Sequence, residues 1–184
     1  RVRRQRQMCI RDSCNPHNPV GHVWTENEMD RLFSICERHK VLIISDEIHQ
    51  DLITGSTPFT SALTVASGAY ADNIIAMSSL SKSFNMASLH HAEVIIPDEK
   101  LRGQYNAYKT HVYHTDSDVI AETAITVAYT HPEAEAWLTD VLAVIRENYE
   151  YLCRELCTAL PQIRISPMDG TYLAWIDSVS YTHL

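Results

Sequence analysis

One lysine lies among four serines in residues 78–85, which read SSLSKSFN. Serine hydroxyls and unpaired backbone N–H groups can bind a phosphate, and the amine of a lysine such as Lys82 can form a Schiff base with a carbonyl. The segment therefore indicates a phosphate site that has a lysine available for covalent chemistry. A solvated loop lysine, or a phosphate site with no covalent bond, would give the same local pattern.

A carboxylate follows another apolar run earlier in the chain. Residues 45–49 read SDEIH and come directly after the apolar residues 41–44. A carboxylate at the end of a buried strand, such as that of Asp46, is costly unless it is paired. A protonated pyridine nitrogen is one suitable partner, while a helix cap or a buried ion pair are the alternatives. A third segment, residues 15–21 (NPHNPVG), alone indicates only a rigid proline-containing turn.

The elements that must position these segments follow from the hydrophobic pattern. The apolar run 41–44 shows no polar alternation, which is typical of a strand buried on both faces in a parallel sheet, and the run 74–77 predicts a second buried strand. Residues 92–96 predict a third such strand, which Pro97 ends. A capping box at Thr25 and Glu28 predicts a helix that ends near Lys40, and residues 61–67 predict a short helix. Alternating helices and strands favour an α/β fold, a mostly parallel sheet sandwiched by helices. Ligands of such sheets bind beyond the carboxyl ends of the strands.

The second half of the chain is mainly helical. Asp98 predicts the start of a helix to about residue 113, and Asp116 or Asp118 the start of another to about residue 130. Pro132 suits the first turn of a long helix over residues 133–160, which we expect to join two domains. The runs 163–165 and 171–176 predict strands joined across Asp169-Gly170, the start of a small α+β domain. The expected domains are therefore residues 14–132 and 161–178, on either side of the long helix.

The two ends of the chain differ from its body. Residues 1–13 carry five Arg and one Asp, a charge of +4, whereas the whole chain carries −8, which leaves −12 for the rest. A basic arm of this kind can bind nucleic acid. However, residues 1–13 and 179–184 resemble translated sequencing-adaptor sequence. We therefore expect the former to be a non-native leader and the latter a non-native tail.

Composition excludes several classes of protein. The acidic body disfavours nucleic acid and anionic membranes as partners, and no apolar run is long enough to span a membrane. None of the ten histidines is spaced as in a zinc motif, so we expect no metal. The five cysteines form no CxxC pair, which favours a reduced, cytoplasmic protein.

Together, the order and spacing of the three segments resemble the class I/II aminotransferase superfamily of pyridoxal-phosphate (PLP) enzymes, fold type I. The resemblance runs from about residue 14 to residue 177. It implies that Lys82 bonds PLP covalently and then removes the proton from the substrate Cα. It also implies that Asp46 pairs with the pyridine nitrogen and Asn18 with the phenolic oxygen. Ser79 and Ser81 would contact the phosphate, so residues 14–132 would form part of the PLP-binding large domain.

A histidine narrows the resemblance within this superfamily. Most aminotransferases have a tyrosine three residues after the aspartate, directed at the phenolic oxygen, and this chain has His49. This histidine and four segments of the chain resemble the cystathionine β-lyase branch. The segments read SDEIHQDL, NPHNPVG, SKSFN and GTYLAWID. His90 stands where many aminotransferases have a phosphate-binding arginine. Ser88 stands where the branch usually has a glycine, and a side chain there could crowd the backbone near the cofactor.

This resemblance implies a carbon–sulfur β-lyase that cleaves L-cystathionine, or another cysteine S-conjugate, to a thiol, pyruvate and ammonia. An aminotransferase on the same scaffold is the first alternative, and a regulatory protein of the same fold is the second. The resemblance also implies that the chain is an internal fragment of a homodimeric enzyme, inactive by itself.

Overall fold

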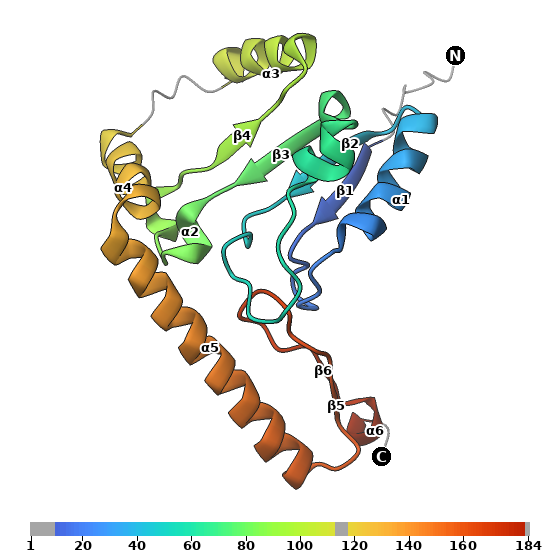
Figure 1. Ribbon diagram of the computed structural model, residues 1–184, viewed down its shortest axis with the longest axis vertical. Coiled ribbons are helices and arrows are strands. Elements are labelled where there is room, and N and C mark those ends of the chain that lie inside the picture. The colour runs from blue at the N-terminus through green and yellow to red at the C-terminus, as the bar shows by residue number, and fades with distance from the viewer. Residues whose placement is uncertain (1–9, 113–117, 183–184) are drawn as a thin grey trace.

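The computed structural model describes residues 10–112 and 118–182, and its central element is a four-stranded sheet in the order β1-β2-β3-β4 (Figure 1). The first three strands are parallel, with Cys14 beside Asp46 and Asp46 beside Met77, so their carboxyl ends lie at one edge. This confirms an α/β fold with a largely parallel sheet. The strands are β1 (Ile10–Cys14), β2 (Leu42–Asp46), β3 (Ile74–Ser78) and β4 (Glu93–Ile95).

One face of the sheet carries the hydrophobic core. Helix α1 (Glu26–Arg38) begins at the predicted capping box, in which Thr25 and Glu28 bond each other's backbone N–H groups. Its buried residue Phe33 packs with Ile43 of β2 and Ile74 of β3. The segment η1 (Ala62–Gly68), capped by Ser61, contributes to the same core, which agrees with the short helix predicted there.

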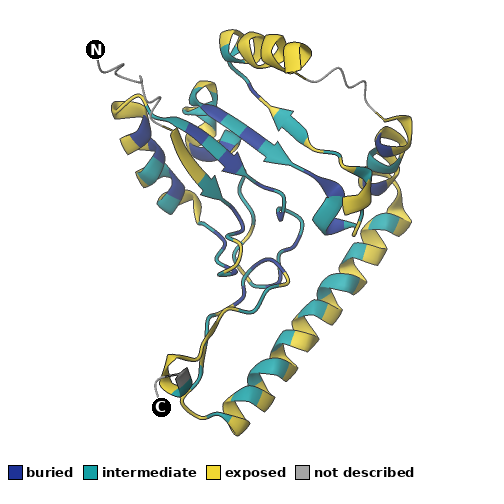
Figure 2. Ribbon diagram, turned by 180° about the vertical axis from the view of Figure 1, so that it is seen from behind, coloured by how far each residue is buried: buried dark blue, intermediate teal, exposed yellow. Residues whose placement is uncertain are grey.

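The opposite face of the sheet differs from the prediction. Ile43 and Ile74 are fully buried, but Ile44 and Ile75, which alternate with them, are only half-buried (Figure 2). Continuous apolar runs predicted strands buried on both faces. Among the described residues, however, the cluster that contains α1 and η1 covers one face.

The fourth strand, β4, is an exception to the predicted parallel arrangement, because it pairs antiparallel with β3. A parallel partner needs a crossover to the other end of the sheet. Here the connection holds only the short helices α2 (Leu80–Ser83) and η3 (Ala87–Leu89), so β4 starts where β3 ended. The predicted burial of this strand is also wrong, since Ile95 is 48% exposed.

The helices of the second half begin where the sequence predicts. Asp98 accepts a hydrogen bond from the N–H of Leu101 at the start of α3 (Glu99–Val112). Asp118 caps α4 (Val119–Thr130), whereas Asp116, the other predicted start, lies outside the described residues. The long helix α5 (Pro132–Ala159) has Pro132 in its first turn. No helix among the described residues could cross a membrane.

The C-terminal strands are shorter than predicted and return to the sheet domain. Strand β5 (Arg164–Ile165) pairs with β6 (Ile176–Asp177), and residues 166–175 form a long loop between them. The N–H groups of Asp169 and Gly170 both donate to the carbonyl of Gly21 at 2.9 Å. Asp169-Gly170 is therefore no tight hairpin turn, because its backbone bonds the loops of the sheet domain instead.

One element lies partly, and another wholly, within the ends that we expect to be non-native. Strand β1 starts at Ile10, inside residues 1–13, and α6 (Val179–Thr182) lies within residues 179–184. The foreign origin of both ends, and the domain boundaries drawn from it, stay predictions.

Candidate active site

The three segments singled out in the sequence meet at the carboxyl edge of the sheet. The turn at residues 15–21 leaves β1, Asp46 ends β2, and Lys82 follows β3. Backbone hydrogen bonds join them, from Asn15 N to Asp46 O at 2.9 Å and from Glu47 N to Met77 O at 2.8 Å. The parallel register therefore brings together residues that are up to 67 positions apart in the chain, from Asn15 to Lys82.

His49 is the buried centre of this edge. Its ring is 1% exposed, and neither ring nitrogen has a hydrogen-bond partner. Burial lowers the pKa of His49; the carboxylate of Asp46 opposes this shift, and the ammonium of Lys82 adds to it. The imidazole is therefore neutral at neutral pH, and it lies within electrostatic reach of both Asp46 and Lys82.

The unpaired nitrogens of His49 test whether a cofactor fits this site. A buried polar atom without a partner costs about 1–3 kcal/mol, so such atoms are rare unless a ligand or water binds them. A ligand oxygen beside His49 would supply the missing bond. Asp46 fits as well: its Oδ1 accepts from Ile48 N at 3.1 Å, and within the described residues its other oxygen has no hydrogen bond. The residues therefore fit PLP, which offers a phenolic oxygen and a ring nitrogen.

The two predicted phosphate-binding serines touch each other at the start of α2. Ser79 caps this helix by accepting from Ser81 N at 3.1 Å, and the two hydroxyl oxygens lie 2.7 Å apart. Ser79 also donates its proton to the carbonyl of His91 at 2.7 Å. Ser81 must then donate to Ser79, and its half-buried hydroxyl can turn toward a phosphate instead. The buried Ser79 is committed to holding the cap.

Lys82 lines a cavity of about 350 Å³ between α2 and α5. On the α2 side the walls are polar, with Ser81, Ser83 and Asn85 beside the lysine. The opposite wall is apolar and comes from α5 and the C-terminal loop: Trp137, Val141, Ile145 and Tyr172. Tyr172 also packs edge-on against His49, with ring centroids 5.7 Å apart. The cavity thus places the lysine opposite an apolar surface.

Asn18 is the predicted site residue that the structure does not bring into contact with the others. It is exposed in its turn, and no hydrogen bond joins its side chain to another described residue. The neighbouring Asn15 is buried instead; it donates to Thr60 O and accepts from Trp24 N, both at 3.0 Å. Asn15 therefore fixes the turn, and Asn18 stands at its surface.

Ser88 and His90 lie in the connection between α2 and β4. Both are exposed, and of the two only His90 has a positive φ, at 49°. The backbone conformation at Ser88 therefore does not require glycine, and the crowding expected near the cofactor stays a prediction. In the described part of the chain, no group of three His, Cys, Asp or Glu side chains is arranged to hold a metal.

Sequence reasoning missed Glu47, which is buried beside Asp46. Its carboxylate accepts from Ser45 Oγ at 3.0 Å, Ser61 Oγ at 2.8 Å and Ala62 N at 2.8 Å. Burial raises the pKa of Glu47, although these three bonds counteract the rise. Glu47 therefore ties the end of β2 to η1. The acidic pair at residues 46–47 was the only sequence signal, and it gives no hint of which carboxylate has its hydrogen bonds satisfied inside the protein.

Comparison with known proteins agrees with this geometry. A family model described as aminotransferase class I and II matches residues 13–181. The cystathionine β-lyase PatB of Bacillus subtilis is 34% identical over 171 residues, which are 91% of this chain and 43% of PatB. Protein MalY of Escherichia coli is 36% identical over 165 residues, 89% of this chain and 41% of MalY.

Solved structures give the same result. The PLP-bound C-S lyase of Staphylococcus hominis matches with a TM-score of 0.85 and 32% identity, over 94% of this chain and 42% of that one. Cystalysin of Treponema denticola, which contains PLP, matches with a TM-score of 0.86 and 28% identity. The chain spans less than half the length of these relatives. It belongs to the aminotransferase class I and II family and has the PLP fold type I architecture that its motifs predicted.

Proposed function

We propose that the full protein containing this chain is a PLP-dependent carbon–sulfur β-lyase. It cleaves L-cystathionine, or a related cysteine S-conjugate, to a thiol, pyruvate and ammonia. The observation that carries this proposal is the cluster of Lys82, Asp46 and His49, in which the buried ring nitrogens of His49 have no partner. The relatives named cystathionine β-lyase and C-S lyase support the reaction type.

Three residues would hold the cofactor ring. Lys82 would bond PLP covalently, and Asp46 would accept a hydrogen bond from the protonated ring nitrogen. The neutral His49 would bond the phenolic oxygen, because a nitrogen of its ring must otherwise stay buried and unpaired. When bound, PLP supplies an electron sink that makes the substrate Cα proton acidic enough to remove.

The remaining site residues would complete the binding. Ser81 would donate to the phosphate from the start of α2, while Ser79 keeps the backbone of that turn in place. Asn18 would reach the phenolic oxygen only if its turn moves toward the cavity, since its side chain is exposed here.

The protein's own residues would then carry the proton. Once it is not bonded to the cofactor, the amine of Lys82 would remain in the cavity and remove the Cα proton of the substrate as a general base. The apolar wall formed by Trp137, Val141 and Tyr172 would line one side of the space in which this proton transfer takes place. Loss of the thiolate from the β-carbon, in place of return of the proton, separates the lyase from an aminotransferase.

We also propose that the full protein is a cytoplasmic homodimer. The resemblance supports the dimer, because enzymes of this family borrow site residues from a partner subunit. Within the described residues, Cys14, Cys36, Cys153 and Cys157 are free thiols, which suits a reducing compartment. Analytical ultracentrifugation of the full protein would test the dimer.

The test of the reaction is pyruvate release from L-cystathionine by the full protein with PLP present. We expect release in the wild type and none in Lys82→Ala. A keto acid formed from a donor amino acid, without pyruvate, would show an aminotransferase instead. Bound PLP with neither product would indicate a regulatory protein.

A further inference from the structure

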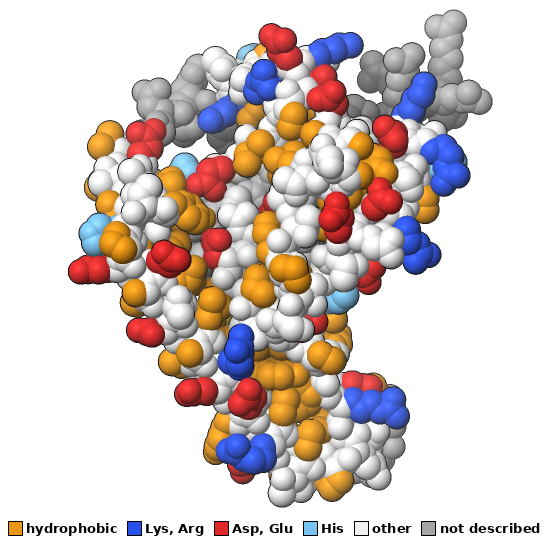
Figure 3. Space-filling view, in the orientation of Figure 1, with side chains coloured by type: hydrophobic (Ala, Val, Ile, Leu, Met, Phe, Trp, Pro, Cys, Tyr) orange, Lys and Arg blue, Asp and Glu red, His pale blue; other side chains and the backbone are white. Residues whose placement is uncertain are grey.

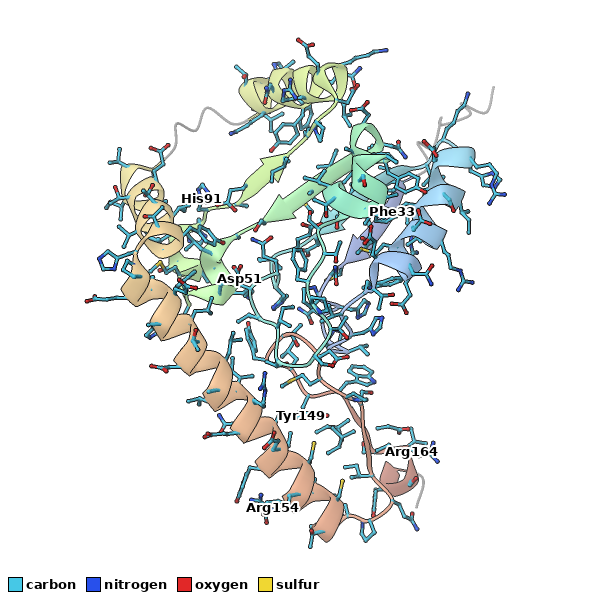
Figure 4. The ribbon with its side chains drawn as sticks, in the orientation of Figure 1. Phe33, Asp51, His91, Tyr149, Arg154 and Arg164 are labelled. Carbon is cyan, nitrogen blue, oxygen red and sulfur yellow. The ribbon has the colours of Figure 1, made fainter. Side chains whose placement is uncertain are left out.

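Asp51 is a half-buried carboxylate that the proposed reaction does not use. It lies two residues after His49, in the turn that leaves β2, and faces α2 (Figure 4). Its Oδ2 accepts a hydrogen bond from Ser83 Oγ at 2.7 Å and a second from the hydroxyl of Tyr129 at 3.3 Å. Since Ser83 follows Lys82 directly, this carboxylate links the turn that carries Asp46 and His49 to the helix that carries the lysine.

Helix α2 depends on such external contacts. It has four residues, and so short a helix is not stable by itself. Ser79 anchors its first turn. Beyond its last residue, Phe84 stacks on Trp137 and meets Tyr129 edge-on, each at a centroid distance of 5.9 Å. Between these two anchors, Ser83 is the buried residue through which α2 bonds the turn after β2.

The bond from Ser83 to Asp51 is of a strong kind. Ser83 is 1% exposed, and a hydrogen bond to a carboxylate is about twice as strong as one between neutral groups. Burial raises the pKa of Tyr129 to about 12, and the charge of Asp51 adds to the shift, so Tyr129 remains a proton donor to Asp51 at neutral pH. Loss of the Asp51 charge would leave the buried Ser83 hydroxyl with a poorer acceptor.

We propose that Asp51 is a positioning residue: through Ser83 it sets the rotation of α2, and thereby the place of the Lys82 amine relative to Asp46 and His49. The inference rests on the proposed covalent role of Lys82. In that step the Lys82 nitrogen attacks the aldehyde carbon of PLP, a C=N bond forms, and one water leaves. Such a reaction is sensitive to misplacement of the attacking atom, because a shift of about 1 Å can cost a hundredfold in rate.

The experiment measures how fast the full-length apoprotein captures PLP, followed by the visible absorption of the covalent product. In Asp51→Asn we expect capture to slow about tenfold. We expect kcat to fall by a similar factor and KM to change less than twofold, because Asp51 lies outside the substrate cavity. A residue that served stability alone would lower the melting temperature and leave the rate of capture unchanged.

A matched control is available on the far side of the core. Asp30 accepts a hydrogen bond from the hydroxyl of Tyr70 at 2.7 Å, so it is also a carboxylate bonded to a tyrosine from a distant part of the chain. Asp30→Asn should affect stability and leave the capture of PLP at the wild-type rate. Ser83→Ala should slow capture as Asp51→Asn does, and the double variant should be no slower than either.

Two results would overturn the inference: capture by Asp51→Asn at the wild-type rate, or independent effects of Asp51→Asn and Ser83→Ala that multiply in the double variant. If Asp51→Asn does not fold, Ser83→Ala decides the question alone. Pyruvate release tests the proposed reaction separately. A wild type that captures PLP without releasing pyruvate would refute the lyase and still decide the role of Asp51.

Discussion

Replacement of His49 by phenylalanine should stabilise the PLP-free protein and weaken its response to PLP. His49 buries two ring nitrogens that have no hydrogen-bond partner, and each such group costs about 1–3 kcal/mol. Phenylalanine has no polar atom at these places and keeps the edge-on contact with Tyr172. Its larger ring costs part of this gain, since overpacking of a core costs about 1–3 kcal/mol. We expect a net gain of about 1–2 kcal/mol.

The assay compares melting temperatures of the full-length protein with and without PLP. For a domain of 150–250 residues, about 1 kcal/mol corresponds to about 2–4 °C. The variant should therefore melt higher than the wild type without PLP, and PLP should raise its melting temperature less. His111→Phe, the same change on the exposed face of α3, should alter stability by less than about 0.5 kcal/mol.

The reasoning would be refuted in either of two ways. A lower melting temperature of the PLP-free variant would mean that bound water or another group satisfies His49 in the wild type. An equal response to PLP in both proteins would mean that the His49 ring does not touch the cofactor, which would remove the main support for the fit of PLP to this site.

Three further predictions concern pH, packing and capping. Burial lowers the pKa of His49 below its ordinary value near 6.5. The wild type without PLP should therefore lose stability as pH falls from 6.5 through the lowered pKa. Calorimetry over that pH range should show a smaller loss of stability for His49→Phe. In Gly170→Ala the new Cβ would lie 2.7 Å from Pro16 Cβ. We expect the free energy of unfolding, measured by denaturant titration, to fall by about 1–3 kcal/mol, and PLP binding, measured by fluorescence, to weaken. Unchanged values would contradict the close packing. Thr25→Ala breaks the capping box of α1 and should cost about 0.5–2 kcal/mol without altering PLP binding.

The sequence predicts the elements of this fold better than their pairing. Helix starts at Thr25, Asp118 and Pro132 are set by side chains within one turn of the helix end, so local residues determine them. The antiparallel direction of β4 depends on how residues 79–92 fold back, and no periodicity in the strand itself reports that. The long loop at residues 166–175 has the same origin, because the N–H groups of Asp169 and Gly170 both bond the carbonyl of Gly21, about 150 positions earlier in the chain.

Some residues of the candidate site could likewise be identified from the sequence, and others only from the folded structure. Lys82 and Asp46 could be found in the sequence, because each stands just after an apolar run, where strand ends place ligand-binding groups. His49 was found through the family resemblance. Asp51 and Tyr172 could not be found in this way. They act through contacts with Ser83 and His49, and those contacts exist only after the chain has folded.

The residues that hold the site in place also differ in chemistry from those that would do the reaction. Lys82 and Asp46 are half-buried, and Asp46 keeps a carboxylate oxygen without a hydrogen bond to any described residue, whereas Glu47 and Ser83 are buried with bonds to other parts of the protein. A buried group with its bonds satisfied cannot also bind a ligand without breaking them, so saturation of hydrogen bonds separates supporting from reacting residues. Buried atoms without a partner also occur in His17, Trp24, Ser78 and His91, so the criterion identifies a reacting residue where it coincides with the charges of Asp46 and Lys82, as it does for His49.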